Sequence, residues 1–163
     1  MRFFKNTCLG VILTAVWLGT AIAGPYDDAL SAKDGGDFAK ARSLLQPLAL
    51  QGDANSQFQL SLLYSNGQGG PVDRKEAVKW LRMAAKRGQV SAQSNLGAAY
   101  SRGWGVPQDS VRALAWFTLA AASGSKEAQT NRDVAMRRMT QADMNLANDM
   151  ATACRQSNLQ GCD

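Results

Sequence analysis

Two glycine pairs, in residues 67–69 (GQG) and 103–105 (GWG), have the G-x-G spacing of phosphate-binding loops. A phosphate loop follows a strand and carries either a Lys-Ser/Thr at the helix start or a third glycine. Neither pair has these companions, and neither follows a predicted strand. The pairs are therefore predicted to be hinges between helices and not a nucleotide site.

Ser123 and Lys126 form an S-x-x-K sequence, which opens the active site of serine penicillin-recognising enzymes. The companion motifs S-D-N and K-T-G are absent from the sequence, and Ser123 lies at a predicted turn. The sequence also has no histidine. This excludes Ser-His-Asp and Cys-His relays and leaves a zinc or iron site with only carboxylates and cysteines as ligands. We expect no catalytic residue, no metal and no cofactor.

The N-terminus is predicted to be a cleaved secretory signal. Arg2 and Lys5 give a positive start, residues 9–20 are apolar, and a small-x-small site ends at Ala23, before Gly24. The alternative is an uncleaved membrane anchor, but the apolar run is shorter than the roughly 20 residues that span a bilayer. We expect cleavage between Ala23 and Gly24 and a mature protein in the periplasm or outside the cell.

The charge and the cysteine content of residues 24–163 bear on the expected partner and on an expected disulfide. Removing residues 1–23 leaves 140 residues with 16 basic and 13 acidic side chains. The basic residues are scattered, so nucleic acid is not an expected partner. Cys154 and Cys162 remain as an even pair in an oxidising compartment, which predicts a disulfide. Such a disulfide closes a short loop, so it holds the C-terminal tail in place but does not constrain the rest of the fold.

An internal repeat with a period of 36 residues organises the rest of the chain. At this offset Tyr64 coincides with Tyr100, and Trp80 coincides with Trp116. A fixed period in this range is typical of a solenoid of helical hairpins. The same offset also aligns Gly52 with Gly88 and Gly124, Leu60 with Leu96, Gly67 with Gly103, Gly69 with Gly105, Pro71 with Pro107, Asp73 with Asp109, and Ala77 with Ala113.

Each unit is predicted to be two helices joined at a glycine pair. A left-handed glycine ends the first helix, and Asp73 or Asp109 caps the second. A last helix is predicted after Thr140, with Leu146, Met150 and Cys154 on its apolar side. We therefore expect an all-α solenoid of seven to eight helices, divided into a signal peptide (1–23), an N-terminal partial repeat (24–52), two full repeats (53–88 and 89–124), and a degenerate repeat with a capping helix and a cysteine-containing tail (125–163).

Residues 92–124 closely resemble the Sel1-like repeat, whose pattern is roughly A-x-x-x-L-G-x-x-Y-x-x-G-x-G-V-x-x-D-x-x-x-A-x-x-W-x-x-x-A-A-x-x-G. The preceding unit departs from it by small replacements, with Ser56, Ser61 and Gly70 in place of Ala, Gly and Val. The resemblance covers about residues 36–140. The matching residues are Ala92, Leu96, Gly97, Tyr100, Gly103, Gly105, Val106, Asp109, Ala113, Trp116, Ala120, Ala121 and Gly124.

The resemblance implies a solenoid of tetratricopeptide-like hairpins that acts as an adaptor for a protein or peptide partner and is not an enzyme. Some cysteine-rich exported members have been linked to penicillin binding or hydrolysis, but they carry a cysteine pair in each repeat, which this chain lacks. The main hypothesis is an exported, monomeric, non-catalytic scaffold in the bacterial cell envelope. The alternatives are a penicillin-recognising or other envelope hydrolase and a cell-wall-associated structural protein.

The partner-binding surface is expected on the first helix of each unit, which lines the concave face if the hairpins stack as in tetratricopeptide proteins. Such a groove suits an extended or helical peptide with an apolar anchor and acidic residues. The alternatives are that Phe58 and Leu62 pack against the helix near residues 26–33, and that Trp104 folds back onto the neighbouring loop. The candidate residues are Asn55, Phe58, Leu62, Asn66, Ser91, Ser94, Ser101, Arg102, Trp104, Arg137 and Arg138.

Overall fold

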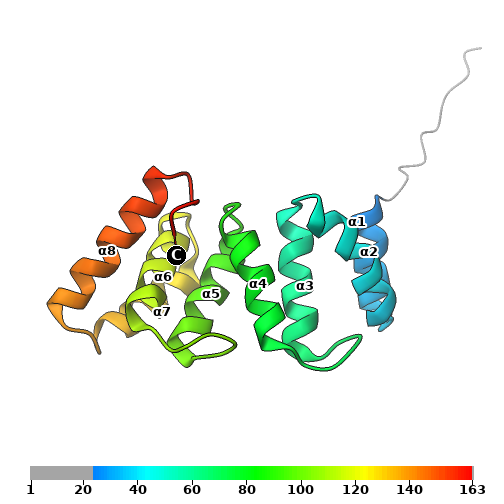
Figure 1. The fold of residues 1–163 in the computed structure, drawn as a ribbon, viewed down its shortest axis with the longest axis horizontal. Helices are drawn as coiled ribbons and strands as arrows, with labels where there is room; N and C mark the ends of the chain where they lie inside the picture. Colours follow the sequence, from blue (N-terminus) through cyan, green and yellow to red (C-terminus); the bar gives the residue numbers. More distant parts are fainter. Residues whose placement is uncertain (1–23, 163) are drawn as a thin grey trace, which may run out of the picture.

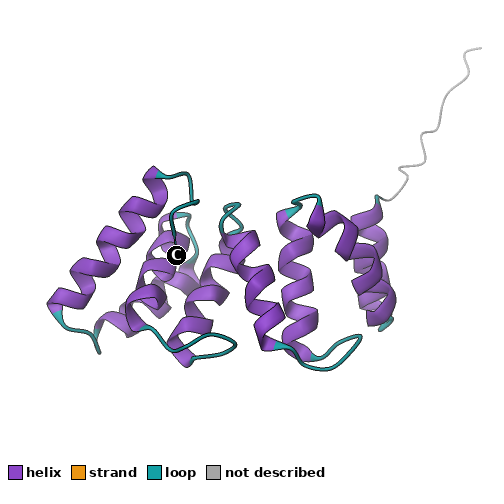
Figure 2. Ribbon diagram, in the orientation of Figure 1, coloured by secondary structure: helices purple, strands orange, loops and turns teal. Residues whose placement is uncertain are grey.

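The computed structural model describes residues 24–162 as eight α-helices that follow one another in chain order from one end of the molecule to the other (Figure 1). No strand occurs in this range (Figure 2). The predicted signal peptide, with Ala23, lies outside the described residues. The helices are α1 (Pro25–Asp34), α2 (Phe38–Leu50), α3 (Ala54–Asn66), α4 (Arg74–Ala85), α5 (Val90–Arg102), α6 (Ser110–Ala122), α7 (Lys126–Met136) and α8 (Gln141–Gln156).

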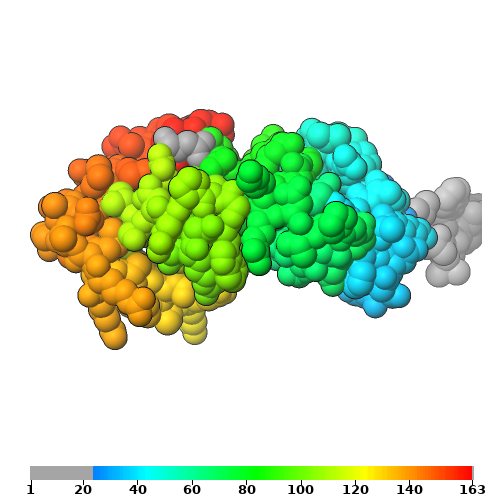
Figure 3. Space-filling view, turned by 60° about the horizontal axis from the view of Figure 1, so that its bottom comes forward, coloured from blue at the N-terminus to red at the C-terminus, as the bar shows by residue number. Residues whose placement is uncertain are grey.

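The helices form a solenoid, as predicted. α1 packs on α2, α3 on α4 and α5 on α6, and each of these hairpins also packs on the next one along the chain. The last two helices differ, since α7 and α8 both pack mainly against α6. The surface is accordingly elongated, with cyan toward one end and orange at the other, while the red C-terminal residues return toward the green part (Figure 3). Within residues 24–162, none of the helices has both the length and the hydropathy that crossing a bilayer requires.

Aspartates start the second helix of each full repeat. The Asp73 carboxylate accepts a hydrogen bond from the backbone N–H of Glu76 at 3.0 Å, and the Asp109 carboxylate accepts one from Arg112 N–H at 2.8 Å. These bonds satisfy backbone donors that the helix itself leaves unpaired. The Glu76 side chain forms an ion pair with Lys79 at 3.1 Å. The predicted capping role of the aspartates is therefore confirmed.

The glycine pairs are hinges, and the second glycine of each pair is also a contact between repeats. Gly103 ends α5 with a left-handed φ of 69°. Gly105 is left-handed as well, with φ 72°, and a Cβ at this position would collide with the backbone carbonyl of Arg74 at the start of α4. Gly69 has the same relation to the carbonyl of Phe38 at the start of α2. Each hairpin loop thus presses against the second helix of the preceding repeat, where only glycine fits.

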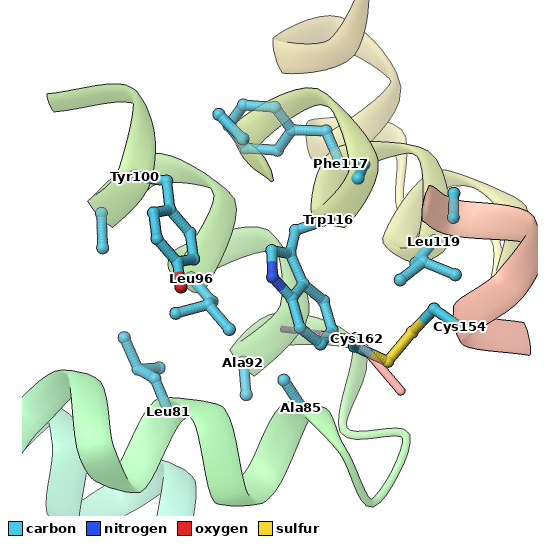
Figure 4. Packing of buried hydrophobic residues seen from close by; sticks show 14 of the residues in the cluster. Leu81, Ala85, Ala92, Leu96, Tyr100, Trp116, Phe117, Leu119, Cys154 and Cys162 are labelled. Atoms are coloured by element: carbon cyan, nitrogen blue, oxygen red, sulfur yellow. A yellow bond between two sulfur atoms is a disulfide. The ribbon is translucent and has the colours of Figure 1, made fainter. Parts of the chain in front are cut away.

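Trp116 fills the centre of the larger hydrophobic core. Its side chain is 1% exposed. The indole points toward Leu96 and Ala92 of α5 and toward the Cys154–Cys162 disulfide (Figure 4). The second helix of one repeat is thereby packed against its own first helix and against the C-terminal tail at once.

Small residues in the first helix are matched to the size of the residue that faces them. A Cβ on Gly97 would lie 2.8 Å from the ring of Phe117, so the large ring requires glycine there. In the preceding repeat the equivalent positions hold Ser61, which is larger than glycine, and Leu81, which is smaller than phenylalanine. The Ser61 hydroxyl donates a hydrogen bond to the carbonyl of Phe58 at 2.6 Å. The departure of Ser61 from the family pattern is therefore accommodated by packing.

The last helix caps the solenoid, but its buried stripe differs from the prediction. Leu146 is 52% exposed, so the expectation that it faces the stack is wrong. α8 buries Cys154, as predicted, and packs Met150 partly against the core, but Ala147 and Ala151 take the place expected for Leu146. Small side chains allow a helix to approach its neighbour closely, which selects the alanine stripe over the adjacent stripe of larger residues.

The C-terminal tail returns to the core through the predicted disulfide. The structure joins Cys154 to Cys162, and Cys162 is only 6% exposed. The side-chain amide of Gln160 donates a hydrogen bond to the backbone carbonyl of Lys86 at 3.5 Å, beyond the end of α4. The tail therefore covers the edge of the core beside Trp116.

The inter-repeat contact at Gly105 predicts that Gly105→Ala is more destabilising than Gly124→Ala. Both glycines have positive φ, and an alanine in that region costs about 1–2 kcal/mol. A Cβ on Gly124 meets open space, whereas a Cβ on Gly105 meets backbone and adds about 1–3 kcal/mol of overpacking. Urea unfolding followed by circular dichroism measures the difference. Equal losses of stability would show that the loop does not press against α4.

Candidate partner-binding groove

Three neighbouring cavities lie along the first helices of the repeats. A cavity of about 380 Å³ lies between α1 and α3, one of about 360 Å³ between the α3–α4 hairpin and α5, and one of about 240 Å³ between the α5–α6 hairpin and α7. Leu62 and Asn66 line both the first and the second, and Ala98 and Arg102 line both the second and the third. The three cavities therefore form one continuous surface, which we call the groove.

The groove is built from three rows of side chains that recur every 36 residues. The helices α3 and α5 contribute positions i, i+3 and i+7 of one stripe, which places them on the same face. α7 contributes the first two positions, and Arg138 follows in the turn after this helix ends at Met136. All nine side chains line the cavities. The rows are a carboxamide row (Gln59, Asn95, Asn131), an apolar row (Leu62, Ala98, Val134) and a polar-to-cationic row (Asn66, Arg102, Arg138).

Positive charge gathers over the second and third cavities. The Arg102 guanidinium lies 4.7 Å from the centre of the Trp104 ring, and Arg74 lies 5.7 Å from the same ring. Within residues 24–162, neither of these arginines nor Arg138 forms an ion pair with a carboxylate. At the first cavity Lys33 is balanced by Asp34. The groove therefore offers three guanidinium groups to an anionic partner at the α5–α7 end.

Two of the three side chains in the carboxamide row are available for hydrogen bonds with a partner. At the first position, Lys33 of α1 donates a hydrogen bond to the Gln59 carboxamide oxygen at 2.9 Å. Burial raises the pKa of the neighbouring Tyr26 phenol above 10.0, and its hydrogen bond with Gln59 offsets this only in part. The carboxamides of Asn95 and Asn131 make no hydrogen bond within the described residues. α1 thus occupies the first position and leaves the other two available.

Six of the predicted partner-binding residues line the groove. Trp104, at the loop after α5, is 49% exposed and lies beside Arg102 and Arg74, so it folds back onto the start of α4 while one part of the ring stays accessible. Leu62 borders the first cavity together with Lys33 and Asp34 of α1. The six residues are Leu62, Asn66, Ser101, Arg102, Trp104 and Arg138.

Five other candidates lie elsewhere. Ser94 is 3% exposed, and Phe58 packs against the core cluster around α4 and α5, so neither side chain lies in the groove. Asn55, Ser91 and Arg137 are exposed but line none of the three cavities. The groove is therefore narrower than the sequence suggested.

Several groove residues were missed although the sequence contains the signal for them. Asn95, Asn131 and Val134 lie at the 36-residue period, which was used for core positions and glycines but not for surface positions. Arg74 follows the capping residue of α4, and only the stacking of repeats brings it to Trp104. The same 36-residue period, applied to the solvent-facing positions of the first helices, predicts Asn95, Asn131 and Val134 as groove residues.

The S-x-x-K sequence lies away from the groove, at the turn between α6 and α7. The Ser123 hydroxyl donates a hydrogen bond to the backbone carbonyl of Leu119 at 3.2 Å, as serines at helix ends commonly do. In residues 24–162, no group of three or more Cys, Asp or Glu side chains is arranged to hold a metal ion.

The fold and the groove define the class: the chain is an α/α solenoid built from helical hairpins. The Sel1 repeat family model matches residues 54–89 and 90–125, which correspond to the α3–α4 and α5–α6 hairpins. These two hairpins are therefore Sel1 repeats, and proteins built from Sel1 repeats are generally non-enzymatic scaffolds for protein interactions. No curated protein sequence matches the chain significantly.

Two solved structures show the same fold. One is c5321, a protective antigen present in uropathogenic Escherichia coli strains, which has 24% sequence identity and a TM-score of 0.77 over 85% of this chain. The match spans 31% of c5321, so this chain corresponds to less than a third of that solenoid. The other is a Sel1 repeat protein from Oxalobacter formigenes, with 28% identity and a TM-score of 0.56, covering 65% of this chain and 95% of that one.

Replacing each of the two tryptophans by alanine is expected to lower the free energy of unfolding by very different amounts. Trp116→Ala removes a fully buried side chain and is expected to cost about 3–5 kcal/mol of unfolding free energy. Trp104→Ala removes a half-exposed side chain and is expected to cost less than about 1 kcal/mol. Chemical denaturation of both variants measures this. If Trp104→Ala were as destabilising as Trp116→Ala, Trp104 would be a structural residue of the joint and not part of an accessible groove.

Proposed function

We propose that this Sel1-like repeat protein is an exported, non-catalytic scaffold that holds a protein partner in the groove. The observation that carries the proposal is the continuous groove across α3, α5 and α7, with Arg74, Arg102 and Arg138 unpaired by any carboxylate among the described residues. Three cations that the protein itself does not neutralise favour association with an acidic partner surface.

Two features support the exported setting. The N-terminal sequence has the positive start, apolar run and small-x-small site of a secretory signal. The Cys154–Cys162 disulfide closes over the core, and disulfides persist in oxidising compartments such as the periplasm and the cell exterior. The cell envelope is therefore the proposed place of action, and the partner is a protein or peptide and not a nucleic acid.

The apolar row supplies the anchor contact for such a partner. Val134 is 46% exposed at the third cavity, and Leu62 borders both the first and the second. Apolar groups in a pocket with a charged rim are the arrangement from which short protein segments gain affinity and orientation. The proposed partner segment therefore combines an apolar residue with acidic residues.

Site-specific photo-crosslinking in cells tests the proposal with the full chain. A photoreactive amino acid at position 62 or 134 is expected to give the same crosslinked partner, because both positions line the groove. Positions 50 and 146 are the controls, since Leu50 and Leu146 are exposed apolar residues outside the three cavities.

Crosslinks from all four positions, or from the control positions alone, would contradict the groove as the interaction site. Retention of the unprocessed N-terminus in the cytoplasm would contradict export. Covalent labelling of Ser123 by a penicillin derivative would contradict the non-catalytic part of the proposal.

A further inference from the structure

We propose that the groove binds an extended acidic segment, with Asn95 and Asn131 holding the backbone of the segment while Arg102 and Arg138 hold acidic side chains three residues apart. This inference rests on the proposed function and adds the conformation and the spacing of the partner segment. It is drawn from the repetition of these four residues on α5 and on α7 with the turn that follows α7.

The chemistry of a carboxamide suits a peptide backbone. A carboxamide presents one acceptor and two donors, so it can accept from one peptide N–H and donate to one peptide C=O at the same time. Asn95 and Asn131 make no hydrogen bond within the described residues, and each lines a cavity. A backbone that crosses both helices satisfies both side chains without depending on the sequence of the segment.

The two arginines supply the sequence preference. Arg102 lies seven positions after Asn95, and Arg138 lies seven positions after Asn131. On α5, seven residues are two helical turns, or about 10.5 Å along the axis. Arg138 lies in the turn two residues beyond the end of α7 and lines the same cavity as Asn131. An aspartate or glutamate side chain directed toward the C-terminal end of each helix bridges this separation together with the long arginine side chain. Arg102 is also held in place by its contact with Trp104.

The separation of the helices sets the conformation of the segment. α5 and α7 both pack on α6 and line the third cavity from two sides, and helices that share a packing neighbour lie on the order of 10 Å apart. In a polyproline II helix, residues i and i+3 point in the same direction and lie about 9.3 Å apart, since the rise is about 3.1 Å per residue. A β-strand instead repeats every two residues, at about 6.6 Å. A segment of polyproline II type therefore matches one acidic residue to each arginine.

The degenerate repeat supports this assignment independently of the cavities. α7 has Arg132 and Met136 where α5 has the core residues Leu96 and Tyr100. The asparagine and the arginine of the groove are nevertheless identical at the 36-residue period, with Arg138 in the turn after α7. Because the core residues differ while these surface residues agree, packing does not account for the agreement, and a shared binding role does.

Defined peptides test the inference. The probe is a nine-residue peptide of alanine and proline, blocked at both ends, with two aspartates three residues apart and a fluorescent label. Fluorescence anisotropy at about 0.15 M ionic strength, where the Debye length is about 8 Å, is expected to show binding that weakens about 3- to 10-fold when the aspartates are made adjacent, or when their backbone nitrogens are methylated.

Protein variants assign the effect to the four residues. Asn95→Ala and Asn131→Ala are each expected to weaken binding about 3- to 10-fold, and Arg138→Ala about 10-fold. Arg137→Ala is the matched control, because it removes the same charge from the adjacent, exposed position outside the cavities. It is expected to change binding less than about 2-fold, as screened surface charges do.

The outcomes separate this inference from the proposed function. If the groove crosslinks a partner in cells but the peptides bind regardless of spacing and methylation, or the asparagine variants bind normally, the inference is overturned and the scaffold function stands. Equal effects of Arg137→Ala and Arg138→Ala would reduce the interaction to net charge and also overturn the inference. If the groove positions give no crosslink, the proposed function itself fails.

Discussion

Stacking of one hairpin on the next is the constraint on which this structure depends. The apolar stripes of α5 and α6 are too wide for one hairpin to bury, so Trp116 and Leu96 reach their full burial only with neighbouring elements in place. The close approach of Gly105 to the Arg74 carbonyl sets how near the loop of one repeat comes to the helix of the preceding one. The same glycines that suggest a phosphate loop in the sequence are therefore the points at which repeats touch.

The groove is a consequence of this stacking. Once the repeats are stacked, side chains at equivalent positions of the first helices form a row across them. The residue type that recurs at a position sets the chemical character of its row. Gln59 and the other members of its row illustrate how the ends of the solenoid limit this surface, because Lys33 of the N-terminal helix occupies the first position. The available surface is thus the part between α3 and α7, where positive charge is also concentrated.

The sequence predicted the fold well because the signals are local and repeated. Asp73, Asp109 and Gly103 act through bonds and torsions within a few residues, and the structure confirms their roles. Predictions that depend on how one element faces another were weaker. Leu146 was placed toward the core although its neighbouring alanines pack there, and Ser94 was placed in the groove although it faces the next hairpin. Periodicity shows that a stripe exists, but neighbouring stripes of similar polarity are separated only by packing.

The central claim is that the open carboxamides of Asn95 and Asn131 contact the partner segment. The most direct measurement is the nuclear magnetic resonance signal of the side-chain amide groups during titration with the aspartate-containing peptide. The side-chain amide signals of Asn95 and Asn131 are expected to shift together and saturate at the same peptide concentration, while that of the exposed Asn148 on α8 stays in place. Shifts confined to the second helices α2, α4 and α6, with both groove asparagines unchanged, would contradict it.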